Sequence, residues 1–76
     1  MTSEALQQLL ADVRASWRSW DQRSKIAHLV HLETLADRAT ALGDADLAYQ
    51  FDVLCEMIAA DVERAAGARQ ESSRQR

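Results

Sequence analysis

Proline is absent from this sequence of 76 residues, and glycine occurs only at positions 43 and 67. The sequence also lacks the alternation of apolar and polar residues typical of strands, and the two-residue turns typical of β-hairpins. The commonest residue types, which include Ala, Leu, Gln, Arg and Glu, are good helix formers. These features predict an all-α fold.

Cysteine occurs once, at Cys55, so a disulfide within the chain is excluded. A single thiol fits a reducing compartment. The segment 1–10 lacks the basic start and long apolar run of a signal peptide, and no stretch approaches the length of a membrane span. We therefore expect a cytoplasmic protein with no contact to a membrane.

The chain has no excess of positive charge: its net charge is −3, with 9 basic and 12 acidic side chains. This argues against general affinity for nucleic acids. The charge is nevertheless unevenly spread. Residues 14–25 are mainly basic, whereas residues 44–63 hold six acidic side chains and neither Lys nor Arg. This polarity suits packing between unlike segments, and it suits three solvated helix faces equally well.

Gly43 and Asp44 mark the clearest boundary in the chain. Glycine adopts the left-handed conformation that ends a helix, and an aspartate directly after it caps the next helix. Because the connection is short, the two helices should be antiparallel neighbours. We expect Gly67 to end the last helix in the same way, with a disordered polar tail over 67–76.

A second boundary lies just after the two tryptophans, Trp17 and Trp20. The apolar pattern changes phase near residue 21, and Ser19 with Gln22 fits a capping box. A bend between residues 19 and 23 therefore predicts helices at about 3–19, 21–42 and 44–66, in a single helical domain spanning 1–66. The alternative is one helix over 3–42, about 60 Å long, with no partner for its first half.

Each expected helix carries an apolar stripe for a common core. The fold class is thus a small antiparallel helical hairpin or three-helix bundle, which we expect to be dimeric because so short a chain buries a small fraction of its surface. The stripes are Leu6, Leu9, Leu10, Val13, Trp17 and Trp20; then Leu29, Leu32, Leu35, Ala36, Ala39 and Leu42; then Leu47, Phe51, Leu54, Cys55, Ile58, Val62 and Ala65.

The last helix has a second apolar stripe, opposite the first, formed by Tyr49, Val53, Met57 and Ala60. Either the first helix covers it or another chain does. Trp, Tyr and Met are enriched at interface cores. We therefore predict a partner-binding surface, for a homodimer or another protein, that includes Trp17, Trp20, Tyr49, Val53 and Met57. The rival hypothesis is that both tryptophans pack inside the bundle against Tyr49, Val53 and Met57.

Catalytic and ligand-binding motifs are sparse. His28 and His31 lie one turn apart, but they lack the clustered Cys and His ligands of zinc sites. Cys55 lies in an apolar stripe and is expected to be a small buried hydrophobe. Asp52 and Glu56 are expected on a solvated face, and no phosphate loop or nucleophile elbow occurs. The sequence therefore predicts a protein that is not an enzyme and has no cofactor or metal.

The leading functional hypothesis is a non-enzymatic protein–protein interaction module, such as a small adaptor, chaperone-like subunit, regulator or inhibitor. One alternative is a dimeric, nucleic-acid-associated regulator that contacts phosphates through Arg14, Arg18 and Lys25. In either case Arg14 and Arg18 are expected on the side of the helix away from the tryptophans. A second alternative is a metal- or haem-binding bundle that uses His28 and His31.

Overall fold

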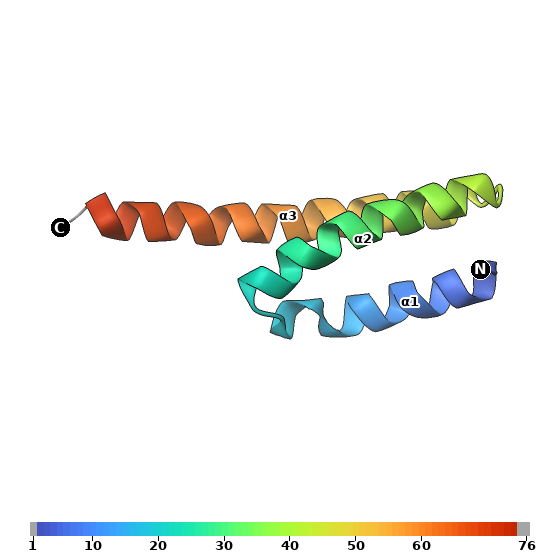
Figure 1. The fold of residues 1–76 in the computed structure, drawn as a ribbon, viewed down its shortest axis with the longest axis horizontal. Helices are drawn as coiled ribbons and strands as arrows, with labels where there is room; N and C mark the ends of the chain where they lie inside the picture. The colour runs from blue at the N-terminus through green and yellow to red at the C-terminus, as the bar shows by residue number, and fades with distance from the viewer. Residues whose placement is uncertain (1, 75–76) are drawn as a thin grey trace.

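The computed structural model describes the backbone of residues 2–74 and the side chains as far as Gly67. Three α-helices and one 3₁₀ turn make up this part: α1 (Ser3–Ser16), η1 (Trp17–Ser19), α2 (Gln22–Ala41) and α3 (Ala45–Arg74). As Figure 1 shows, α2 and α3 form an antiparallel hairpin, and α1 lies along the same end of α3. No strand occurs in the described part, so the predicted all-α, three-helix fold is confirmed.

The turn between α2 and α3 is built as predicted. Gly43 has a φ of 81°, and its N–H donates to the Thr40 carbonyl while the Asp44 N–H donates to the Ala39 carbonyl, both at 3.0 Å. These two bonds form the Schellman arrangement that ends helices at glycine. The Asp44 carboxylate then accepts the Leu47 N–H at 3.1 Å, which confirms it as the N-cap of α3.

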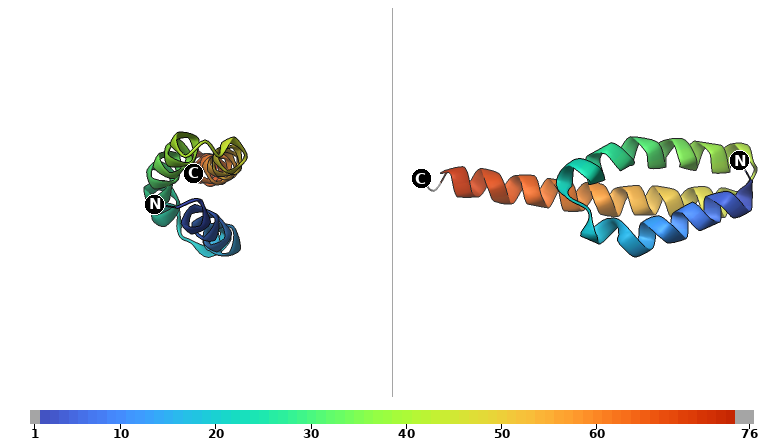
Figure 2. Two further views of the ribbon diagram at one scale, coloured as in Figure 1. Left: turned by 90° about the vertical axis from the view of Figure 1, so that its right-hand side faces the viewer. Right: turned by 60° about the horizontal axis from the view of Figure 1, so that its bottom comes forward.

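Asp44 also ties the start of the chain to this turn. The Ser3 hydroxyl donates to the second carboxylate oxygen of Asp44 at 2.9 Å. Thr2 caps α1 itself, since its hydroxyl accepts the Ala5 N–H at 3.2 Å. The first turn of α1 is therefore held beside the α2–α3 turn, as the right view of Figure 2 shows.

The predicted bend between residues 19 and 23 is confirmed, but its cap is a different residue. Trp20 is extended, with φ −73° and ψ 149°, and the Asp21 carboxylate accepts the Ser24 N–H at 2.7 Å. This hydrogen bond holds the pKa of Asp21 below its ordinary value. Ser19 is not the cap because it belongs to the 3₁₀ turn, where its hydroxyl donates to the Ser16 carbonyl at 2.7 Å.

The core lies where the three predicted stripes meet. Leu9, Val13, Trp20, Leu29, Cys55 and Val62 are partly buried against it, whereas Leu42, predicted to join the core, is half exposed at the end of α2. The buried apolar residues are Leu6, Leu10, Trp17, Leu32, Leu35, Ala36, Ala39, Leu47, Ala48, Phe51, Leu54 and Ile58.

The third helix is longer than predicted, because it continues through Gly67 to Arg74. The predicted end at residue 66 is therefore wrong. Gly67 lacks the positive φ of Gly43, and a glycine inside a helix costs only about 1 kcal/mol relative to alanine. The residues around it are mainly good helix formers, and α3 extends beyond the other two helices (Figures 1 and 2). The last two positions of the predicted tail, 75 and 76, lie outside the described residues.

Asp44→Ala is expected to lower the free energy of unfolding by about 1–2 kcal/mol, because it removes both the cap of α3 and the acceptor of the Ser3 hydroxyl. Ser3→Ala removes only the tie to α1, so a net hydrogen-bond loss of about 0.5–1 kcal/mol is expected. Urea denaturation of both variants and of the double variant separates the two contributions. An Asp44→Ala protein with an unchanged midpoint would contradict the capping role.

Phe51→Ala is expected to lower the free energy of unfolding by about 3–5 kcal/mol, because this fully buried ring leaves a cavity at the centre of the core. Tyr49→Ala, two residues away on the exposed side of α3, is the matched control and should change it by about 0.5 kcal/mol or less. Equal losses in the two variants would show that the core is misassigned.

Candidate functional site

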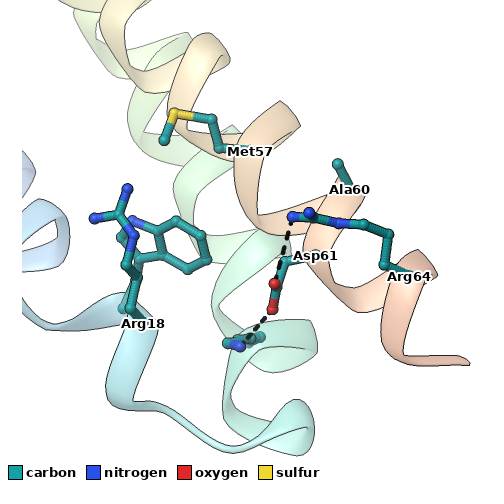
Figure 3. A pocket seen from close by; sticks show the side chains of 7 residues that line it. Arg18, Met57, Ala60, Asp61 and Arg64 are labelled. Atoms are coloured by element: carbon teal, nitrogen blue, oxygen red, sulfur yellow. Dashed lines mark hydrogen bonds and ion pairs between the residues drawn. The ribbon is translucent and has the colours of Figure 1, made fainter. Parts of the chain in front are cut away.

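Two adjoining hollows lie between α1–η1 and α3, and together we call them the furrow. The larger, of about 450 Å³, is lined by Trp17, Arg18, Lys25, Met57, Ala60, Asp61 and Arg64. The smaller, of about 260 Å³, shares the first two residues and Met57, and adds Arg14, Gln50, Val53 and Leu54. In Figure 3, Arg18 stands on one side of the larger hollow and Met57, Ala60 and Arg64 follow α3 on the other.

Trp17 forms the floor that both hollows share. Its side chain is only 5% exposed and belongs to the core of the bundle. Met57, Val53 and Leu54 line the same hollows from α3. This placement corresponds to the rival hypothesis of a tryptophan packed inside the bundle, so Trp17 has little surface left for a partner.

Arg18 lies over the Trp17 ring, with 4.9 Å between the guanidinium carbon and the ring centroid. The expectation that Arg18 points away from the tryptophans is wrong, because it assumed α-helical spacing. Residues 17–19 form a 3₁₀ turn with about three residues per turn, which changes the direction of each side chain. The attraction between a cation and an aromatic face then favours the observed position.

Lys25 is buried, whereas Arg14 and Arg18 are exposed on the surface. It is 6% exposed, its Nζ lies 2.6 Å from the Asp61 carboxylate, and it lies 5.7 Å from the Trp17 ring centroid. Lys25 therefore joins α2 to α3 instead of extending the basic stripe of Arg14 and Arg18. The pair also links the basic segment 14–25 to the acidic segment 44–63, as one of the two interpretations of their charge anticipated.

Asp61 is placed between two cations, since Arg64 lies 3.5 Å from its other carboxylate oxygen (Figure 3). The hydrogen bond from Lys25 holds the pKa of the Asp61 carboxyl below its ordinary value, and the charges of Lys25 and Arg64 act in the same direction. Asp61 is thus ionised at neutral pH and neutralises the lysine beside it.

The second apolar stripe of α3 remains largely open to solvent. Tyr49 is 64% exposed and Met57 is 41% exposed, while Val53 is half-buried and Ala60 is exposed. Because α1 lies to one side of this stripe, it covers only part of it. The sequence left open whether the first helix covers this stripe. Within one chain it does not cover the stripe completely.

The furrow is locally positive on a negatively charged protein. Four basic side chains line it, namely Arg14, Arg18, Lys25 and Arg64, against the single acidic side chain of Asp61. Within the described side chains, neither Arg14 nor Arg18 forms an ion pair. Two unneutralised guanidinium groups therefore stand on the α1–η1 side of an apolar floor.

Trp20 has a different environment from Trp17. Its ring stacks on His28 with centroids 4.2 Å apart and planes at 30°, and the His28 Nδ1 lies 2.7 Å from the Ser24 carbonyl oxygen. The apolar pattern of 17–20 would continue to His28 in an unbroken helix. The stack forms instead because the bend folds Trp20 back onto the first turns of α2, which the sequence pattern did not indicate.

The remaining residues considered for chemistry lie apart from the furrow. Burial raises the pKa of the Cys55 thiol, with Glu33 and Asp52 acting in the same direction, so the reactive thiolate is scarce. Asp52, Glu56 and His31 are exposed. In the described part of the chain, no three His, Cys, Asp or Glu side chains are grouped closely enough to hold a metal ion.

Two further observations concern more of the chain than the furrow. Across residues 2–74, no helix combines the length and the apolar character needed to cross a membrane. No protein-family model, curated protein or solved structure matches this chain. The furrow therefore has to be interpreted from its own residues.

The ion pair between Lys25 and Asp61 predicts a specific dependence of stability on pH. Because the pKa of Asp61 is lowered on folding, its contribution is fully present above about pH 4, the ordinary range of this carboxyl, and is lost as the pH falls through the lower folded value. The difference in unfolding free energy between wild type and Asp61→Asn should therefore be largest near neutral pH and shrink below about pH 4.

Urea denaturation between about pH 2 and about pH 7 measures that difference. Titration of Asp21, which occurs in the same acidic range, is common to both proteins and cancels. The control is the same substitution in a Lys25→Met background, where the pH dependence should be much smaller. A difference that is equally large in both backgrounds would show that Lys25 does not cause it.

Proposed function

We propose that this chain is a non-enzymatic, cytoplasmic protein–protein interaction module whose binding surface is the furrow and the adjoining apolar stripe of α3. One observation carries the proposal: Tyr49 and Met57 remain open to solvent, and half-buried Val53 lines with Met57 the hollow floored by Trp17. Contiguous apolar surface on a small protein marks a site for a partner.

The composition of this surface supports the proposal. Tyr, Trp, Met and Arg are the residue types enriched at interface cores and hot spots, and all four line or adjoin the furrow. Met57 has the flexible side chain that adapts to a partner's shape. Trp17 would act here as a rigid support below the contact surface rather than as the contact itself.

The proposal of a module without catalysis rests on the state of the reactive groups. The one thiol has a raised pKa, and the exposed pair Asp52 and Glu56 does not line either hollow. A general acid or base has to lie within hydrogen-bond reach of a bound substrate. The furrow offers guanidinium groups and apolar side chains, and its one carboxylate, Asp61, is held in ion pairs with Lys25 and Arg64.

A nucleic-acid partner is supported less well. Phosphate binding draws on many cations placed along one track. Lys25 is paired to Asp61, so among the described side chains that line the furrow only Arg14 and Arg18 are cations without an ion pair. These two residues alone form a short cationic patch beside a large apolar one, which is the more usual composition of a protein-binding surface.

A photo-crosslinking side chain introduced at Met57 tests the proposed function in the cell of origin. Ultraviolet light should yield a discrete adduct with a protein, because position 57 lies within the binding surface. Thr34, exposed on α2 away from the furrow, is the control position and should yield none. The mass of the adduct shows whether a different chain or a second copy is bound. Equal, diffuse labelling from both positions would contradict the proposal.

A further inference from the structure

We infer that the occupant of the furrow is an amphipathic helix of a different protein, with an apolar face flanked by carboxylates. This inference rests on the proposed function and narrows it to one class of partner. Three observations lead to it: the shape of the furrow, the spacing of its apolar side chains, and the position of its cations.

The shape favours a helix. The furrow runs along α3 from Gln50 to Arg64, which corresponds to about 21 Å at about 1.5 Å per residue. Both of its sides are helical, and the described residues contain no strand whose edge could pair with an extended peptide. A helix of about fourteen residues, or four turns, matches this length.

The apolar side chains have the spacing that a helix can engage. Val53, Met57 and Ala60 follow one another at intervals of four and three residues on α3, and Trp17 of η1 lines the same hollows. This arrangement provides a continuous ridge with a hollow beside it. Apolar side chains at positions i, i+3, i+4 and i+7 of a second helix would pack along it, as in other complexes between a helix and a groove.

The cations specify the flanks of the bound helix. Arg14 and Arg18 are four residues apart on one side of the furrow, and Arg64 lies on the other. A helix seated between them would need acidic residues beside its apolar face, because guanidinium groups bind carboxylates with paired hydrogen bonds. Arg64 is partly engaged by Asp61, so Arg14 and Arg18 should contribute most.

The same charges disfavour a second copy of this chain as the occupant. A twofold dimer places identical surface patches against each other, so the arginines of one furrow would face those of the other. Contact between the furrow and an acidic face elsewhere on a second copy would have to repeat reciprocally about a twofold axis, or else be head-to-tail and form rings or open filaments. A separate acidic helix avoids both difficulties.

Three synthetic peptides of about fourteen residues test the inference directly. The first places leucines at helical spacing and glutamates on both flanks; the second replaces every glutamate with lysine; the third has the composition of the first in an order that destroys the apolar face. Labelling methionine methyl groups with ¹³C gives one signal from Met57 and one from Met1, the only two methionines. Met57→Leu identifies the first of these signals.

The acidic amphipathic peptide should shift the Met57 signal on titration and bind about tenfold more tightly than the lysine peptide, as expected for two or three exposed charge pairs. Arg14→Glu/Arg18→Glu should reverse this preference. The matched control is Arg23→Glu/Arg38→Glu, which has the same net charge but alters exposed arginines of α2 outside the furrow, and it should leave the preference unchanged. If the first double variant unfolds, Arg14→Gln/Arg18→Gln serves instead and should abolish the preference.

Several results would overturn the inference. The first is equal binding of the acidic and lysine peptides, and the second is binding of the third peptide, which has no apolar face, as tightly as the first. The others are displacement of the acidic peptide by a duplex DNA oligonucleotide at physiological salt, and self-association that covers Met57. The proposed function would survive the first two results if the crosslinker at Met57 still captured a protein. If the crosslinker at Met57 captured no protein but the furrow still preferred the acidic peptide over the lysine peptide, the proposed function would be contradicted. The inferred selectivity of the furrow for acidic helices would then stand.

Discussion

The packing of α3 is the constraint on which the rest of the structure depends. This helix carries two apolar stripes, but a chain of 76 residues supplies only two other helices to cover them. The hairpin with α2 covers the stripe of Phe51, Leu54 and Ile58 along its length, and α1 contacts α3 far less extensively. Small domains bury a limited share of their surface. The furrow is therefore the place where a fourth helix of a bundle would lie.

The break after α1 determines both the fold and the character of the furrow. An unbroken helix over 3–42 would leave its first half without a partner in the same chain. The 3₁₀ turn and the extended Trp20 reverse the chain instead, and the two tryptophans separate. Trp17 enters the core, where it supports the furrow, whereas Trp20 stacks on His28 and holds the bend closed. One local change of backbone geometry thus produces two different aromatic sites.

Sequence patterns predicted the parts of this structure that depend on local rules. Helical spacing identified the buried stripes, and the conformational freedom of Gly43 with the cap at Asp44 located the α2–α3 turn. The patterns failed where two alternative local structures, such as two helix caps, differ little in free energy. Ser19 and Asp21 are both good caps, and the 3₁₀ turn used the serine. Gly67 is a residue type typical of helix ends, but the chain does not turn at this position and the helix continues. The direction of Arg18 and the burial of Lys25 depend on tertiary contacts, to Trp17 and Asp61, which no pattern within one helix contains.

The ion pair between Lys25 and Asp61 explains how a negatively charged protein presents a positive furrow. The acidic residues of segment 44–63 are spread around α3, and Asp61 alone lines the furrow, where Lys25 and Arg64 neutralise it. Arg14 and Arg18 are left without an ion pair among the described side chains. A guanidinium group is weakly hydrated for a cation, so Arg18 covers the Trp17 ring without the cost of desolvating an ammonium group. The free furrow therefore stays compatible with water, while its charge and its apolar floor both remain available to a second helix.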